Sequence, residues 1–138
     1  MYNYRDFSQT GVLLGAGISR TVFVLNTTQV IKFGSEEVNQ REVTRWESVR
    51  GTSAEKYFFP VLSHAEDYSW IIMERAVDTV NNALKMSRAS KDYQQKYDKV
   101  YNFGAEVNKL GVVSVHDNHS GNIGVRSDGT WAFLDYAY

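Results

Sequence analysis

The sequence predicts an α+β protein in which a five-stranded antiparallel sheet with one helix precedes a small, mainly helical region. Short apolar runs separated by turn residues recur through residues 12–73, with one amphipathic helical stripe among them. A longer helical stripe then covers residues 90–110, and two more short apolar runs follow it. A chain of 138 residues suits one domain or two small lobes that share a cleft, which we place at residues 1–75 and 76–138.

The composition excludes several classes of function. The net charge of −1 and the pI near 6.3 give no positive field for nucleic acid, and Lys and Arg are scattered rather than clustered. No apolar run is long enough to span a membrane, and the first residues do not resemble a signal peptide. The absence of cysteine excludes disulfide scaffolds and thiolate zinc sites. We therefore expect a cytoplasmic protein that binds neither nucleic acid nor membrane.

The first strands of the predicted sheet flank a glycine turn. Residues 12–25 are predicted to form a strand, a turn and a second strand, and residues 29–33 a third. Gly15 and Gly17 lie in the turn, where glycine allows the backbone to approach phosphates and donate its amide groups. A strand rather than a helix follows, which argues against the Rossmann and Walker phosphate motifs. Glycines in a hairpin also commonly serve as turn residues alone, so both interpretations stay open at this point.

One helix and two further strands complete the first lobe. The helix is predicted over residues 36–49, with Ser35 as its N-cap and acidic residues in its first turn. Apolar runs at residues 61–65 and 68–73 are the fourth and fifth strands. The first lobe is therefore expected to hold five strands and one helix.

This helix carries a single carboxylate within its apolar stripe. The stripe is formed by Val38, Glu42, Trp46 and Val49. A carboxylate that faces a core must find a cation. Lys32, on the third predicted strand, is the nearest candidate, and we predict that Glu42 pairs with it. The alternative is a glutamate at the rim of the core, paired with Arg41 or Arg45.

Two helices are predicted in the second lobe. Asp78 is a candidate cap for a short helix over residues 79–86, and a long amphipathic helix covers residues 90–110, with Gly111 as its C-cap. The stripe of the long helix is formed by Tyr93, Tyr97, Val100, Tyr101, Gly104, Val107 and Leu110. We predict that its tyrosines belong to the core and do not form a cofactor platform.

Three polar residues stand out near the C-terminal end, Asp117, Asn122 and Asp135. A strand that begins at Asn122 and another over residues 130–134 are joined by a strong hairpin signal at residues 126–129. This hairpin returns Asp135 beside Asn122. A carboxylate and an amide oxygen placed together are hard ligands of the kind that Mg²⁺ takes alongside substrate phosphates. Asp117, just upstream, is positioned to meet a hydroxyl group.

Two motifs at this end of the chain resemble the catalytic loop and the metal-binding motif of the protein-kinase-like superfamily. They are Asp117-Asn118-His119-Ser120-Gly121-Asn122-Ile123 and Leu134-Asp135-Tyr136-Ala137. The pattern Asp-x-His-x-x-Asn-Ile resembles that of the aminoglycoside-phosphotransferase branch and of small phage-encoded kinase-like proteins. The order of the other elements agrees with this family, and the resemblance covers Gly11 to Ala137.

The resemblance implies an ATP- and Mg²⁺-dependent phosphotransferase that acts on a hydroxyl of a protein or a small molecule. Asp117 would orient or deprotonate the acceptor hydroxyl, and Asn122 and Asp135 would hold Mg²⁺. Lys32, fixed by Glu42, would neutralise the phosphates. Together these residues would supply positioning and charge stabilisation rather than covalent chemistry.

The resemblance also assigns the residues around the nucleotide. They are Gly15, Gly17, Val22, Lys32, Met73, Glu74 and Ala76. The glycines would form a lid over the phosphates, the valine would pack on adenine, the methionine would guard the pocket, and the last two residues would form the hinge. Arg20 stands where the family has its third glycine.

Departures from the family leave alternatives. The chain stops three residues after Asp135, and Tyr136 and Ala137 stand where the family has Phe-Gly. The alternative function is a nucleotide-binding pseudokinase acting as an interaction or inhibitor protein, including a phage-encoded one directed at a target in the host cytoplasm. We expect a protein partner or substrate, or a second copy of the chain. Transfer of AMP, and a phosphohydrolase built on His116-Asp117 with His64, are the remaining interpretations.

Overall fold

The structure is a computed structural model, and it describes residues 2–17, 19–112, 114–116 and 118–138. The fold is α+β, and the chain divides into two compact units. The first unit consists of Met1–Thr44, Pro60–Arg75 and Ala137, and the second of Arg45–Phe59, Ala76–Tyr136 and Tyr138.

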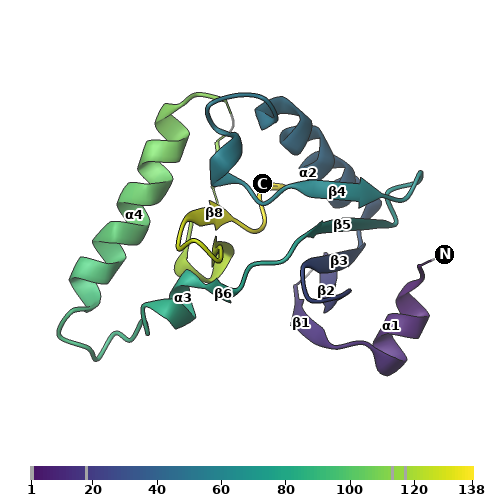
Figure 1. The fold of residues 1–138 in the computed structure, drawn as a ribbon, viewed down its shortest axis with the longest axis horizontal. Helices are drawn as coiled ribbons and strands as arrows, with labels where there is room; N and C mark the ends of the chain where they lie inside the picture. The colour runs from purple at the N-terminus through teal and green to yellow at the C-terminus, as the bar shows by residue number, and fades with distance from the viewer. Residues whose placement is uncertain (1, 18, 113, 117) are drawn as a thin grey trace. The chain divides into compact units, whose positions relative to one another are not determined.

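The first unit is built on a five-stranded antiparallel sheet with the order β1-β2-β3-β5-β4 (Figure 1). The strands are β1 (Leu13–Ala16), β2 (Arg20–Val24), β3 (Gln29–Gly34), β4 (Val61–His64) and β5 (Trp70–Glu74). The predicted five-stranded antiparallel sheet is therefore confirmed. The central strand β3 is buried along most of its length, as its run of large apolar residues favours.

Helix α2 covers Glu36–Val49, the span that the sequence predicts. The predicted N-cap is formed, because the Ser35 hydroxyl oxygen accepts a hydrogen bond from the Val38 amide at 3.2 Å. The Asn39 side chain donates to the Tyr68 carbonyl oxygen at 2.8 Å. This bond fastens the start of α2 to the turn between β4 and β5.

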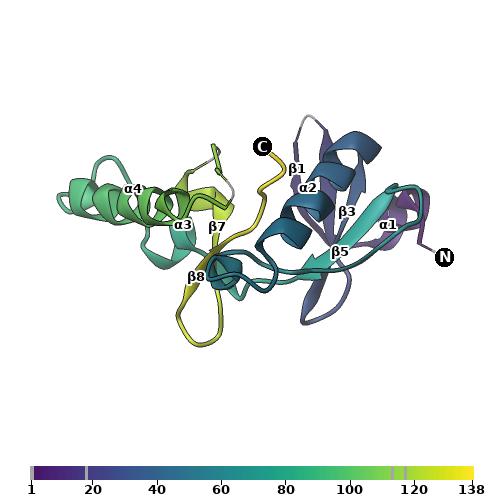
Figure 2. The same ribbon diagram turned by 90° about the horizontal axis from the view of Figure 1, so that it is seen from above.

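A helix at the N-terminus, α1 (Tyr4–Thr10), has no counterpart in the prediction from sequence. Asn3 caps it, and Phe7 packs on Phe23 and Phe33 at ring-centroid distances of 5.7 and 5.3 Å. Phe23 and Phe33 belong to a core cluster on one face of the sheet. Helix α1 therefore covers the face that α2 does not, as Figure 2 shows from above.

The second unit contains a three-stranded antiparallel sheet with the order β6-β7-β8 and the long helix α4 (Figure 1). The strands are β6 (Asp78–Thr79), β7 (Ile123–Val125) and β8 (Trp131–Phe133). The helices are η1 (Glu55–Tyr57), α3 (Val80–Ala83), α4 (Tyr93–Lys109) and η2 (Ser120–Asn122). The predicted C-terminal hairpin is confirmed, and Gly129 takes a φ of 85° in its turn, which favours glycine.

Some predicted boundaries in the second unit are wrong. The short helix predicted over residues 79–86 is limited to α3. Its N-cap is Thr79 and not Asp78, because the Asp78 carboxylate accepts a hydrogen bond from the Thr79 amide instead. Asn122 ends η2 rather than beginning a strand. Gly111 has a φ of 71°, as expected after a helix end. The helices in the described part of the chain are all too short or too polar to cross a membrane.

The prediction that the tyrosines of α4 are core is wrong for two of them. Val100, Gly104 and Val107 are buried, whereas Tyr97 is 47% and Tyr101 60% exposed. Residues four apart advance by about 40° around a helix, so a row of tyrosines at four-residue steps turns away from the buried face. The buried stripe of α4 is therefore narrower than the sequence pattern.

Candidate functional site

Lys32 lies on the central strand of the first unit and forms a buried ion pair with α2. Its Nζ is 2.7 Å from Glu42 Oε1, and the two side chains are 6% and 0% exposed. The predicted pairing is therefore present. Arg41 and Arg45, the alternative partners considered for Glu42, have other contacts. Arg41 contacts Glu37 at 3.2 Å, and Arg45 donates to a backbone carbonyl oxygen.

Arg20 is a second cation on the same carboxylate. Its Nη1 lies 2.9 Å from Glu42 Oε1 and donates to Asn39 Oδ1 at 3.2 Å. The sequence analysis does not predict that Arg20 contacts Glu42, because the family resemblance marks Arg20 only as a replacement for glycine. A signal was present: side chains alternate along a strand, so Arg20 shares a face with Val22, the direct cross-strand partner of Lys32.

Gly15 lies in strand β1, opposite Val22, and not in the turn where the sequence analysis places it, whereas Gly17 follows the strand. The packing of the described residues requires glycine at neither position. A Cβ built on Gly15 meets nothing within 4 Å, and one built on Gly17 meets only the Arg20 carbonyl oxygen at 4.0 Å. Neither glycine has a positive φ. Gly34 is different, because its φ is +134° and a Cβ there would lie 2.2 Å from the Ser19 carbonyl oxygen. Space beside the hairpin is therefore left open at Gly15 and Gly17.

Apolar side chains surround Lys32 on its face of the sheet. Val22 and Ile71 pair directly with Lys32 across the neighbouring strands, and Val30 pairs with Met73. Directly paired residues share a face. Val30 and Met73 are buried, and Val22 is half-buried. Val22, expected to pack on adenine, and Met73, expected to guard the pocket, thus lie on the same face of the sheet as the Lys32 ammonium group.

The two predicted hinge residues belong to different units. Glu74 ends β5, and its amide donates to the Pro60 carbonyl oxygen at 3.2 Å. Ala76 belongs to the second unit, where a Cβ built on Gly124 would lie 2.8 Å from the Ala76 methyl group. Gly124 is therefore needed for close packing around Ala76.

Asn122 and Asp135 are adjacent at the end of the β7–β8 hairpin. The Asn122 side chain donates to the Asp135 carbonyl oxygen at 2.7 Å and accepts from the Asp135 amide at 2.9 Å. Asn122 is 4% exposed, and Asp135 is half-buried. Asn122 and Asp135 are adjacent, as predicted. The Asn122 amide oxygen, which is expected to face a metal, already accepts a hydrogen bond from the Asp135 backbone amide.

Asp117, the predicted catalytic residue, lies outside the described residues. The segments on either side of it are held on α4. Asn108 accepts from the Val115 amide at 3.0 Å and donates to the Val115 carbonyl oxygen at 3.4 Å. A Cβ built on Gly104 would lie 1.8 Å from Asn118 Nδ2, so only glycine leaves room for this side chain.

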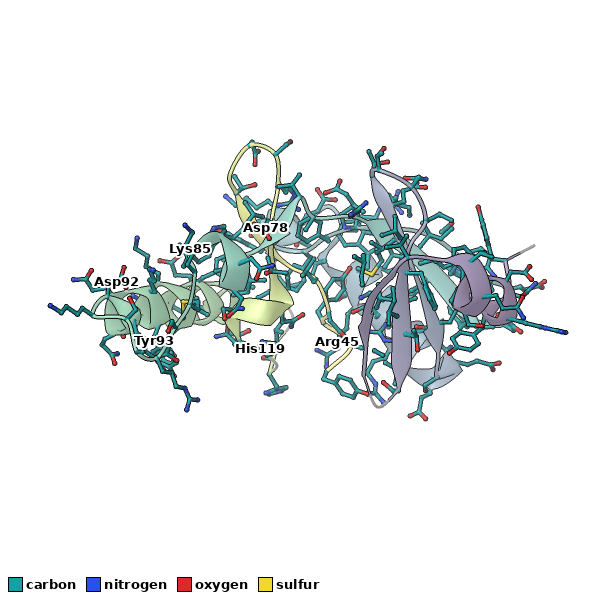
Figure 3. All side chains as sticks on the ribbon, turned by 90° about the horizontal axis from the view of Figure 1, so that it is seen from below. Arg45, Asp78, Lys85, Asp92, Tyr93 and His119 are labelled. Atoms are coloured by element: carbon teal, nitrogen blue, oxygen red, sulfur yellow. The ribbon has the colours of Figure 1, made fainter. Side chains whose placement is uncertain are left out.

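His119 stands at the N-cap of η2, where Figure 3 labels it. Its Nδ1 accepts a hydrogen bond from the Gly121 amide at 3.1 Å. The histidine therefore orders the backbone of the turn that leads to Asn122.

Tyr136 anchors the chain directly after Asp135. It is 1% exposed, its hydroxyl donates to the Phe59 carbonyl oxygen at 2.7 Å, and its ring packs edge-on against Phe58. The sequence marks this position only as a departure from the Phe of the resembling family. In the structure it is a core residue of the second unit.

Hydrogen bonds in surface turns hold the pKa of three aspartates below the ordinary value. In each case the largest cause is a hydroxyl two residues away, in the pairs Asp67–Ser69, Asp92–Ser90 and Asp128–Thr130. All three carboxylates are exposed. These shifts stabilise turns and helix ends and do not identify a reactive group.

In the first unit, the buried ammonium group of Lys32 and the open space at two glycines suit an anionic ligand. Across the residues that the structure describes, His, Cys, Asp and Glu form no group of three or more able to hold a metal. Asp135 and Asn122 alone would supply only part of a magnesium shell.

Comparison with known proteins adds no family. No protein-family model matches the chain, and no curated protein matches it.

Proposed function

We propose that the protein is a kinase-like phosphotransferase that uses ATP and Mg²⁺ to transfer the γ-phosphoryl group to a hydroxyl of a protein or a small molecule. The observation that carries this proposal is the buried pair of Lys32 and Glu42, 2.7 Å apart, on the same face as Val22 and Met73. It agrees with the resemblance of the C-terminal motifs to the kinase-like superfamily.

The energetics of the pair support a functional role. A buried ion pair seldom stabilises a fold more than apolar residues of similar volume, because both charges lose their hydration. A strand lysine and a helix glutamate held almost free of solvent are therefore better explained by a ligand that needs the ammonium group. A triphosphate is such a ligand, since the strand lysine of protein kinases neutralises the charge of the phosphates.

Each predicted residue takes a role on this proposal. Gly15 and Gly17 let backbone amides approach phosphate oxygens. Asp135 and Asn122 are the candidate ligands of Mg²⁺, which when bound would neutralise charge on the phosphates. Asp117 orients the acceptor hydroxyl or takes its proton. The remaining apolar residues around Lys32 offer a surface for an adenine ring.

Binding of ATP is the first test of this function. Isothermal titration calorimetry with ATP and Mg²⁺ is expected to give binding by the wild type and a loss of at least about tenfold in Lys32→Met, because the phosphates lose their cation. Arg5→Met is the matched control, since Arg5 is an exposed cation of the same unit. Equal affinity in Lys32→Met and the control contradicts the proposal.

Transfer is tested separately, with radiolabelled ATP and Mg²⁺ and a panel of protein and small-molecule acceptors. The wild type is expected to transfer label and Asp117→Ala to lose transfer while keeping ATP binding. Mass spectrometry of the product distinguishes added phosphate from added AMP. Transfer at wild-type rates by Asp117→Ala contradicts the assigned role.

A second candidate function is a nucleotide-binding pseudokinase that acts through a protein partner. The observation in its favour is the Asn122 side chain, which bonds both backbone groups of Asp135 and so has a structural use without a metal. This candidate predicts ATP binding that does not depend on Mg²⁺, together with no transfer. Titration of ATP with Mg²⁺ and with EDTA separates the two functions.

A further inference from the structure

The β1–β2 hairpin is fastened to α2 at the first residue of β2. Arg20 is 6% exposed and contacts both Glu42 and Asn39, which lie one turn apart on the helix. The turn end of the hairpin is held a second time, because the Ser35 amide donates to the Ser19 carbonyl oxygen at 2.9 Å. The start of β2 is thus joined to the start of α2 by side-chain and backbone contacts.

The opposite face of the same hairpin is covered as well. Phe23 of β2 packs on Phe7 of α1, and the Val24 amide donates to the Val12 carbonyl oxygen at 2.9 Å. The hairpin is therefore held by its pairing with β3, by the aromatic contacts of α1 and by the contacts of Arg20. A third glycine at position 20 would remove the side-chain contacts to Glu42 and Asn39.

We propose that Arg20 is a positioning residue that holds the glycine hairpin in one arrangement and couples it to Lys32 through the shared carboxylate of Glu42. The guanidinium is suited to this because it stays charged and one Nη1 group bonds both Glu42 and Asn39. Residues 12–17 and 19–24 of the hairpin are then held in one arrangement. The consequence for ATP rests on the proposed function, whereas the consequence for the hairpin does not.

The two cations are not equivalent in this arrangement. Removal of Arg20 leaves Lys32 and Glu42 paired, so it releases the hairpin while the ammonium group stays in place. Arg20→Met tests this because methionine keeps much of the apolar length and adds none of the backbone freedom of glycine. Arg20→Lys keeps the charge but lacks the planar fork, and we expect it to restore part of the effect.

Hydrogen exchange of the protein without nucleotide measures the hairpin directly. In Arg20→Met, peptides from residues 12–24 are expected to exchange at least about tenfold faster than in wild type, while peptides from residues 69–74 are unchanged. Arg20→Lys is expected to be intermediate. The matched control is Arg5→Met, which removes an exposed arginine of the same unit and is expected to change neither region.

Exchange in residues 12–24 that is equal in Arg20→Met and Arg5→Met overturns the inference. Should Arg20→Met not fold, the same comparison is made with Arg20→Lys. Calorimetry supplies the second readout: ATP affinity is expected to fall by about tenfold in Arg20→Met and partly recover in Arg20→Lys. Faster hairpin exchange with unchanged ATP affinity also overturns the positioning role. If the wild type itself binds no ATP, the proposed function fails, and the exchange experiment still decides the inference.

Discussion

The two units hold their polar candidate residues in different ways. In the first unit, Arg20 and Lys32 from neighbouring strands meet the buried carboxylate of Glu42 from a helix. In the second, Asn122 bonds the backbone of Asp135, at the other end of the same hairpin. One arrangement depends on charges brought together by tertiary structure, and the other on neutral hydrogen bonds within one local motif.

The two arrangements differ in how much stability they lose when one side chain is removed. Loss of one member of a buried charge cluster leaves the other charges without compensation, so the cost is large and spreads over several elements. Loss of a hydrogen bond in a hairpin costs less, because the neighbouring ladder still defines the backbone.

Glu42→Gln is expected to have the largest effect on stability. It leaves the buried cations Lys32 and Arg20 without their shared carboxylate, and we expect the free energy of unfolding to fall by about 3–5 kcal/mol. Urea denaturation measures this. Glu47→Gln, at an exposed position of the same helix, is the control and is expected to change stability by less than about 0.5 kcal/mol. Similar values for both variants would show that the cluster is not a charge-dependent unit.

Asn122→Ala is expected to have an intermediate effect. It removes both hydrogen bonds to the Asp135 backbone, and we expect a loss of about 2 kcal/mol by the same denaturation measurement. Asn102→Ala, at an exposed position of α4, is the control. A loss as large as that of Glu42→Gln would remove the contrast between the two units.

Tyr136→Phe is expected to cost about 1 kcal/mol, because the Phe59 carbonyl oxygen loses its hydroxyl donor while the ring stays packed. The control is Tyr101→Phe, since Tyr101 is 60% exposed. Stability that is unchanged in Tyr136→Phe would mean that water replaces the hydroxyl and that the chain after Asp135 is held by packing alone.

The smallest effect is expected from the pH dependence of the β7–β8 turn. The Thr130 hydroxyl lowers the pKa of Asp128 below its usual 3.8, so the folded state favours the ionised form. This contribution is present above pH 3.8 and is lost as the pH falls through the lowered folded-state pKa. Melting temperatures of wild type and Asp128→Asn between pH 7 and pH 2 are expected to converge at the acid end. A difference that grows on acidification contradicts this sign.

The parts of the fold that follow from local patterns were predictable. The five strands follow from apolar runs between turn residues, and α2 from its capping serine and its stripe. The pairing of Lys32 with Glu42 was predictable for the same reason, since a carboxylate within an apolar stripe requires a cation. The adjacency of Asn122 and Asp135 follows from the hairpin signal between them.

The parts that depend on tertiary detail were not predictable. The Arg20 contact depends on where β2 begins and on its register with β3, and the sequence specifies neither. Helix α1 is only 7 residues long, too short for a helical period to emerge from its sequence. The exposure of Tyr97 and Tyr101 depends on how much of α4 its neighbours cover, which periodicity alone does not give.

The proposed phosphotransferase function requires Lys32 and Asp135 to act on the same nucleotide. The most direct test is titration calorimetry of ATP with Mg²⁺ against wild type, Lys32→Ala, Asp135→Ala and the double variant, with Arg5→Met as control. The account predicts that each single variant weakens binding by at least about tenfold and that the double variant departs from additivity by more than about 0.5 kcal/mol. ATP affinity that is the same in Asp135→Ala as in wild type, or strictly additive losses, would contradict it.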